Sequence, residues 1–225
     1  MIPPLIVQQA VDQGINLIAI TDHNATANIA AVQKAAQGSG LVVLPGMELQ
    51  TKEEVHVLCL FDTLEQAEAL QETVNRSLPD IENQPEHFGE QFVVDETGDF
   101  IRRELRLLIT SANLTMNQAW QLVSDLGGLM IPAHIDRRAF GLIATLGFVP
   151  TDIQLEALEI SRLLKPEDVA KRFPQIAGYP LIRSGDAHML SEFLGANEFQ
   201  ITHPIISELR KALNIIEGRS YRILP

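Results

Sequence analysis

The sequence has 225 residues and 46% hydrophobic content, which is enough for a single domain, 1–225, with a sizeable core. Proteins that bind extended duplex nucleic acid usually present a basic face to the phosphates. The formal net charge of −12 therefore argues against such a partner. Cys59 is the single cysteine, so an intramolecular disulfide is excluded and we expect a cytoplasmic protein. No apolar run approaches ~18 residues and no signal-peptide pattern is present, so we expect no membrane partner.

The predicted elements of the first third alternate between helix and strand. Residues 1–13 have prolines in the first turn and apolar residues at helical spacing, which predicts a helix. The apolar run 17–20 predicts a buried strand, and the alanine-rich segment 24–37 predicts a helix that ends at glycines. Two more strands are predicted for residues 41–44 and 54–60.

The middle of the sequence interrupts this alternation. Residues 64–78 have the apolar spacing of an amphipathic helix. From about 79 to 109 the periodicity fails and acidic residues are frequent. Because a loop of this length inside a compact domain is more often functional than idle, we expect an inserted cap-like segment over the site, with a short hairpin around Thr97-Gly98.

The remaining elements return to alternation. Thr115 is a good N-cap for a helix that runs to Leu126. The other predicted elements are strands at 128–131, 155–160, 180–182 and 198–201 and helices at 166–172 and 204–216. Strands that alternate with helices favour an α/β fold with a mostly parallel sheet, closed as a barrel.

Potential metal ligands stand where four of the predicted strands end. These residues are Asp22, His23, Glu48, His134, Asp186 and His188. A structural role is the commoner explanation for any one of them alone, but the carboxyl ends of parallel strands build one shared site. Asp186 and His188 are two residues apart, which on an extended backbone points both side chains to one side. Histidine and carboxylate ligands suit zinc, manganese or iron, so the pattern predicts a metal site.

Two further residues lie close to these strand ends. His56 is within reach of Glu48 if their strands are neighbours. Arg137 follows the strand that leads to His134, and its guanidinium can hold a phosphate through two hydrogen bonds. A solvated charge pair is the alternative for Arg137, and the sequence leaves both open.

Five motifs, in order and rough spacing, resemble the successive metal-binding motifs of the PHP (polymerase and histidinol phosphatase) family. The motifs are Thr21-Asp22-His23, Gly46-Met47-Glu48, Val55-His56, Pro132-Ala133-His134 and Ser184-Gly185-Asp186-Ala187-His188. They extend over nearly the whole chain, which makes the match more specific than any single motif. The resemblance implies a distorted (β/α)7 barrel with up to three metal ions at the carboxyl ends of its strands, and hydrolysis of phosphoester bonds.

The resemblance also implies a role for each matching residue. The implied ligands are Glu48, His56 and His134 at one metal, Asp186 with a share of Glu48 at another, and His23 with His188 at a third. Asp22 would orient His23 through a hydrogen bond, and Arg137 would grip a phosphate oxygen. The implied reaction is hydrolysis of a small phosphomonoester or a nucleotide phosphate by a metal-activated water.

One departure from the family pattern changes these expectations. The family opens with a strand that ends in a His-x-His pair, and this sequence begins at the helix beyond that strand. We therefore expect a barrel without its first strand, fewer than three metals, and an exposed apolar seam that favours homo-oligomers. The alternative function is a catalytically weakened PHP-like domain that acts as an interaction or regulatory module. Amide or deaminase chemistry on a related barrel is less favoured.

Overall fold

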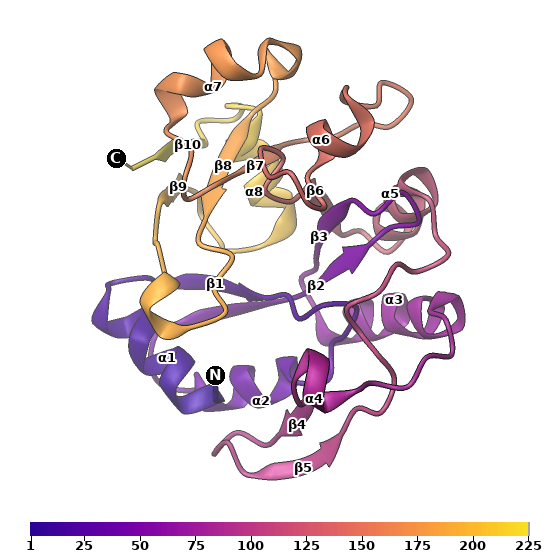
Figure 1. The fold of residues 1–225 in the computed structure, drawn as a ribbon. Coiled ribbons are helices and arrows are strands. Elements are labelled where there is room, and N and C mark those ends of the chain that lie inside the picture. Colours follow the sequence, from indigo (N-terminus) through magenta and orange to yellow (C-terminus); the bar gives the residue numbers. More distant parts are fainter. Residues whose placement is uncertain (225) are drawn as a thin grey trace.

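Helices and strands alternate along most of the chain, and the computed structural model describes residues 1–224 (Figure 1). The helices are α1 (Pro3–Asp12), α2 (Ile29–Ala35), α3 (Leu64–Ser77), α4 (Pro85–Phe88), α5 (Met116–Asp125), α6 (Leu142–Leu146), α7 (Pro166–Arg172) and α8 (Ile206–Leu213). The strands are β1 (Leu17–Ile20), β2 (Val42–Gln50), β3 (His56–Leu60), β4 (Phe92–Val94), β5 (Phe100–Arg103), β6 (Leu129–Pro132), β7 (Leu158–Ser161), β8 (Leu181–Ser184), β9 (Asn197–Gln200) and β10 (Ser220–Ile223). None of the described helices is both long and apolar enough to cross a lipid bilayer.

The strands form a central sheet and three separate pairs. The central sheet has the order β1-β2-β3-β6, and β7 pairs only with β8 in the described part of the chain. Strand β1 is parallel to β2, but β3 is antiparallel to both β2 and β6. The fold is therefore mixed α/β, and the mostly parallel, closed (β/α)7 barrel does not form among residues 1–224. The link 51–55 between β2 and β3 explains the difference, because it is too short for a parallel crossover.

The core packs α3 and α5 against the central sheet. Both helices begin at a capping box, in which Thr63 pairs with Gln66 and Thr115 with Gln118. The side chain of Gln66 also donates to the backbone oxygen of Leu126 at 2.8 Å, which ties the start of α3 to the end of α5. Because α3 packs on β2 and α5 on β6, these helices fix the strands whose ends carry the candidate site.

Strand β1 forms an open edge of the sheet. Its four residues are all half-buried, and β2 is its sole strand partner among the described residues. A cavity of about 1520 Å³ lies along this edge, with residues of β1, β8 and β9 in its wall.

Residues 79–109 form a short helix and a hairpin. Strands β4 and β5 pair antiparallel around a turn, in which Oδ1 of Asp95 accepts from the backbone nitrogen of Thr97 at 2.9 Å. The Asn28 side chain holds this hairpin against the segment after β1, since its Oδ1 accepts from the backbone nitrogen of Val94 at 3.1 Å. Phe92 and Val94 line the cavity beside β1, so the inserted segment forms part of its wall.

Candidate metal centre

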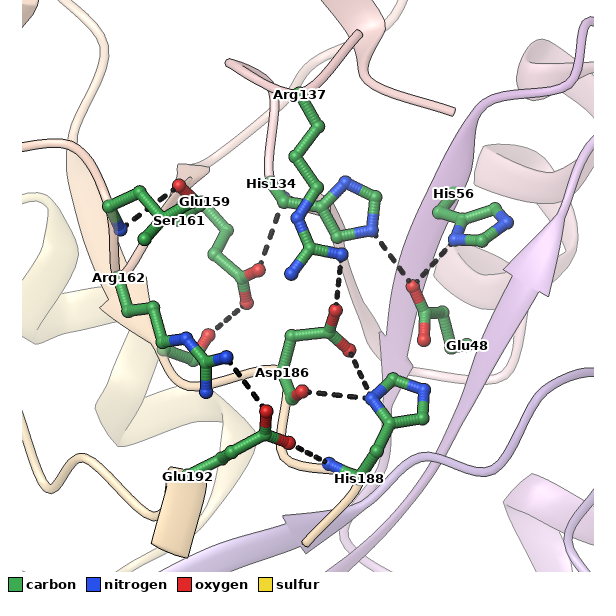
Figure 2. Close-up of polar contacts among 12 residues, drawn as sticks. Glu48, His56, His134, Arg137, Glu159, Ser161, Arg162, Asp186, His188 and Glu192 are labelled. Carbon is green, nitrogen blue, oxygen red and sulfur yellow. Dashed lines mark hydrogen bonds and ion pairs between the residues drawn. The ribbon is translucent and has the colours of Figure 1, made fainter. Parts of the chain in front are cut away.

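Three histidines surround the carboxylate of Glu48. Nδ1 of His56 lies 2.8 Å and Nε2 of His134 lies 3.2 Å from Oε1 of Glu48 (Figure 2). Nδ1 of His23 lies 3.5 Å from the other oxygen, Oε2. Glu48, His56 and His134 are buried, and His23 is half-buried. The structure thus brings together four of the residues that the motifs identified.

Strand register explains why these side chains share one face. Gln50 pairs with His56 across β2 and β3, and Glu48 lies two residues before Gln50, on the same face of the strand. His23 follows β1 and forms an isolated parallel bridge with Glu48. His134 follows β6 with a left-handed φ of +30°. The ends of β1, β2, β3 and β6 therefore converge without a closed barrel.

The ionisation of Glu48 depends on its histidine partners. Burial alone raises the pKa of Glu48, but hydrogen bonds with His134 and His56 outweigh burial and hold this pKa below its ordinary value. For His134, burial acts to lower the pKa, but the hydrogen bond with Glu48 outweighs burial and raises this pKa above its ordinary value. Burial lowers the pKa of His23, with Glu48 acting in the opposite direction. Glu48 is therefore ionised at neutral pH, as a metal ligand must be.

Two overlapping sets of potential ligands share Glu48 and His56. In the first set, His23, Glu48 and His56 each offer one atom, and these atoms lie within 4.8 Å of one another. In the second set, the one implied by the motifs, His134 takes the place of His23. Both sets combine imidazole nitrogen and carboxylate oxygen, which suits a divalent transition metal.

Asp186 and His188 approach from the turn after β8. Oδ2 of Asp186 pairs with Nη1 of Arg137 at 2.5 Å, and Nδ1 of His188 lies 3.7 Å from Oδ1 of Asp186 (Figure 2). The rings of His188 and His23 are 5.9 Å apart between centroids. The predicted extended geometry is wrong, because β8 ends at Ser184 and Asp186 has a left-handed φ of +48°. A turn, rather than strand alternation, brings this pair together.

Glu159, near the end of β7, is a buried carboxylate that the motifs did not identify. Its Oε1 accepts from the backbone nitrogen of His134 at 3.1 Å, and its Oε2 accepts from the hydroxyl of Ser184 (Figure 2). Glu159 thus joins the ends of β6 and β8, next to His134 and Asp186. Burial raises the pKa of Glu159 to about 7, against the opposing hydrogen bonds of Ser184 and His134. A charged residue between the apolar neighbours Leu158 and Ile160 was the signal that could have identified it.

Asp22 has a different partner from the one expected. Its Oδ2 accepts from Nδ2 of Asn28 at 3.1 Å, and its carboxylate forms no hydrogen bond with His23 in the described part of the chain. The backbone oxygen of Asp22 accepts from the backbone nitrogen of Glu48 at 3.2 Å. Asp22 therefore aligns the segment after β1 with β2 through its backbone.

A cavity of about 700 Å³ opens beside the histidines. Its lining includes potential metal ligands, namely His23, His56, His134, Asp186 and His188. It also includes the cationic side chains of Arg137, Arg138 and Arg172 and the apolar side chains of Phe140 and Leu163. Three of its lining residues, His134, Phe140 and Asp186, have left-handed backbone conformations. Such strain in non-glycine residues is costly and clusters at functional sites.

The sequence model of the PHP domain family matches residues 3–131. The chain belongs to the PHP domain family. The matched range contains Glu48, His56 and the His23 segment, so the resemblance drawn from the motifs is confirmed. No curated protein matches the chain.

Solved structures share the PHP fold of this chain. Endonuclease Q from Pyrococcus furiosus, a lesion-specific endonuclease, superimposes with a TM-score of 0.71 and 20% identity over 98% of this chain and 53% of that chain. Endonuclease Q in complex with a 27-mer duplex substrate that has an abasic lesion at the active site gives the same values. A protein assigned as a metal-dependent phosphoesterase from Bifidobacterium adolescentis has a TM-score of 0.56 and 20% identity over 84% of this chain and 82% of that chain. At these identities the likeness concerns the fold, and this chain spans about half the length of endonuclease Q.

The prediction that excluded extended duplex nucleic acid is wrong. It rested on the net charge of −12, yet endonuclease Q, which shares the fold over 98% of this chain, is solved with a 27-mer duplex. Net charge describes the whole surface, whereas recognition depends on the charge close to the site. In this PHP domain, Arg137, Arg138 and Arg172 line the cavity beside the histidines.

Proposed function

We propose that this PHP domain is a metal-dependent hydrolase of phosphoester bonds. The observation that carries the proposal is the convergence of three histidines on the buried carboxylate of Glu48, beside a cavity with arginines in its wall. Histidine and carboxylate suit a divalent metal, and guanidinium groups suit phosphate oxygens. Membership of the PHP family supports both assignments.

The distances from Glu48 to two of its histidines fit a divalent metal, as does the chemistry of these donor atoms. Metal–nitrogen and metal–oxygen bonds of about 2.0–2.2 Å place two ligands of one ion at most ~4.4 Å apart. Oε1 of Glu48 lies 2.8 Å from His56 and 3.2 Å from His134, within that limit. We assign these three residues to one ion. The motifs imply Asp186 with a share of Glu48 at a second ion and His23 with His188 at a third. A bound divalent ion would activate water and offset the charge of the phosphate.

The protein's own residues would bind and orient the substrate. Asp186 fixes the guanidinium of Arg137 through their 2.5 Å ion pair, and the remaining N–H groups of Arg137 can hold non-bridging phosphate oxygens. Glu159 positions His134 through its backbone nitrogen. In hydrolysis, water adds across the ester P–O bond: the attacking oxygen loses a proton and the leaving oxygen gains one.

We propose a small phosphomonoester or a nucleotide phosphate as the substrate. A cavity of about 700 Å³ supports this choice, because pockets of roughly 300–1,000 Å³ take small molecules. Endonuclease Q, whose chain is about twice as long, has been solved with a 27-mer duplex substrate, so nucleic acid belongs to the substrates to be tested.

The test is hydrolysis of p-nitrophenyl phosphate and bis-p-nitrophenyl phosphate with added manganese or zinc. We expect turnover that rises with added metal and is lost in Glu48→Gln. The matched control is Glu72→Gln, an exposed position on α3, which should retain full activity. A protein that binds metal but hydrolyses neither ester would contradict the proposal and favour the interaction module.

A further inference from the structure

We propose that a nucleotide subsite adjoins the metal centre, in which Phe140 stacks on a nucleobase and Arg138 and Arg172 hold the next phosphate of the strand. The residues come from the segment 137–141 and from the end of α7, and they share the 700 Å³ cavity with the histidines. This inference rests on the proposed function and deepens it, because it names a nucleic acid strand as the substrate.

Phe140 forms a platform on the metal centre. Its ring stacks on the ring of His56, with centroids 4.5 Å apart and an interplanar angle of 4°. The backbone nitrogen of His56 also donates to the backbone oxygen of Phe140 at 3.0 Å. Phe140 is nevertheless 39% exposed and lines the cavity. One face of the ring is therefore fixed by the protein while part of the side chain remains open to a ligand.

The backbone around Phe140 is held in a strained conformation. Phe140 has a φ of +59°, which a residue with a bulky side chain rarely adopts. The next residue must be glycine, because a Cβ on Gly141 would collide with the backbone oxygen of Arg137. The protein maintains strain that presents an aromatic ring at the site, which is how functional residues are commonly displayed.

Arg138 and Arg172 are positively charged groups that the protein leaves unneutralised. Among residues 1–224, neither arginine forms an ion pair, whereas Arg137 pairs with Asp186 and Arg162 with Glu192. Both are exposed, and both line the same cavity as Phe140. In a chain with a net charge of −12, two free guanidinium groups beside a metal centre indicate an anionic ligand.

An aromatic platform and free arginines together match the chemistry of a nucleotide strand. Every nucleobase has a π face that stacks on an aromatic side chain, and successive phosphates pair with arginine. One phosphate would be held at the metal centre and the next by Arg138 and Arg172, with the base between them on Phe140. A phosphorylated peptide would supply one phosphate and leave these two arginines without a partner, so the strand is the better match.

The test is equilibrium binding of fluorescein-labelled oligothymidylate with a 5′-phosphate, measured by anisotropy in EDTA so that no hydrolysis occurs. A second probe has an abasic residue in place of the first base. We expect Phe140→Ala to weaken binding of the normal probe about tenfold and that of the abasic probe less than about twofold. Phe140→Trp should retain affinity for the normal probe. The matched control Phe148→Ala, an exposed phenylalanine outside both cavities, should change neither.

The arginines are tested by salt dependence. The double variant Arg138→Ala/Arg172→Ala should bind both probes more weakly and reduce the slope of log affinity against log salt by about 0.7 for each phosphate that an arginine no longer neutralises. Arg76→Ala, an exposed arginine on α3, is the control and should leave the slope unchanged. Equal losses for both probes in Phe140→Ala, an unchanged salt slope, or equal competition by a phosphotyrosine peptide would overturn the inference. Because binding is measured without metal, failure of hydrolysis in the metal-loaded protein is a separate result.

Discussion

The two halves of the candidate site are held in place in different ways. In the first half, Glu48, His56 and His134 are buried at the ends of strands of the central sheet, with nitrogen–oxygen distances of 2.8 and 3.2 Å. In the second half, Asp186 and His188 stand on the turn after β8, and the side chain of His188 is 62% exposed. The first half is fixed by sheet packing, and the second by the polar contacts of one turn.

This difference predicts a division of work between the halves. Ligands that packing holds in position lose little conformational entropy when they bind an ion, so the buried half should bind metal more tightly. The turn after β8 can adjust, and its Asp186 also holds Arg137, so the second half should contribute more to substrate binding. Substitutions in each half therefore test whether the two halves differ in this way.

The largest effect is expected from Glu48→Gln. This change removes the charge that three histidines surround and should weaken metal binding more than about 100-fold, beyond the ~10–100-fold typical of losing an indirect partner of a metal. Asp186→Asn should weaken metal binding about tenfold. Isothermal titration with zinc or manganese measures both values. Equal losses in the two variants would mean that the halves do not differ.

Glu159→Leu should have the next largest effect. It leaves the backbone nitrogen of His134 and the hydroxyl of Ser184 without their acceptor, at a cost of about 1–3 kcal/mol in the free energy of unfolding. Metal affinity should fall about tenfold because His134 loses its support. Urea unfolding and metal titration give the two values. Glu159→Gln retains an acceptor oxygen and should recover most of the affinity; no recovery would argue against a positioning role.

Arg137→Ala tests the second half. The ion pair with Asp186 is partly exposed, with 36% of the Arg137 side chain accessible, so its loss should change the free energy of unfolding by less than about 1 kcal/mol. The KM for a phosphoester should rise about tenfold, because a charged hydrogen bond to phosphate is lost. Steady-state kinetics at saturating metal provides the check. A change in kcat with an unchanged KM would place Arg137 outside substrate binding.

The smallest effect concerns the scaffold, away from both halves. Hydrogen bonds from Arg219 and Thr202 hold the pKa of Glu208 below its ordinary value. A depressed carboxylate pKa stabilises the fold above the unfolded-state pKa of about 4.3, and this stabilisation is lost as the pH falls. Glu208→Gln should therefore lower the Tm at pH 7, and the difference from wild type should shrink below about pH 4. A difference that grows in acid would reverse the sign of this argument.

Much of the fold could be predicted from the sequence, because apolar spacing and glycine stops are local signals. Most predicted strands and helices lie within a few residues of their observed positions, as with β1 at Leu17–Ile20 and α3 at Leu64–Ser77. The prediction of a mostly parallel sheet is wrong, because it extended the helix–strand alternation to all strands, although the short link 51–55 already requires β3 to be antiparallel to β2. Barrel closure depends on long-range pairing, which local patterns do not determine.

The candidate site was likewise predicted only in part from the sequence. The motifs identified the residues that gather around Glu48, because side-chain chemistry at strand ends is visible in a sequence. The left-handed turn at Asp186, the role of Glu159 as a brace and the stacking of Phe140 on His56 were not visible. Each of these depends on contacts between elements far apart in the chain, or on a backbone conformation that no residue type specifies.

The central claim is that the buried half binds a metal ion through Glu48, His56 and His134. Elemental analysis of the purified protein and of His134→Ala tests it most directly, with His203→Ala as a control outside the histidine cluster. We expect at least one equivalent of zinc, manganese or iron per chain in the wild type and in the control, and a clear loss in His134→Ala. Identical metal content in wild type and His134→Ala would contradict the claim.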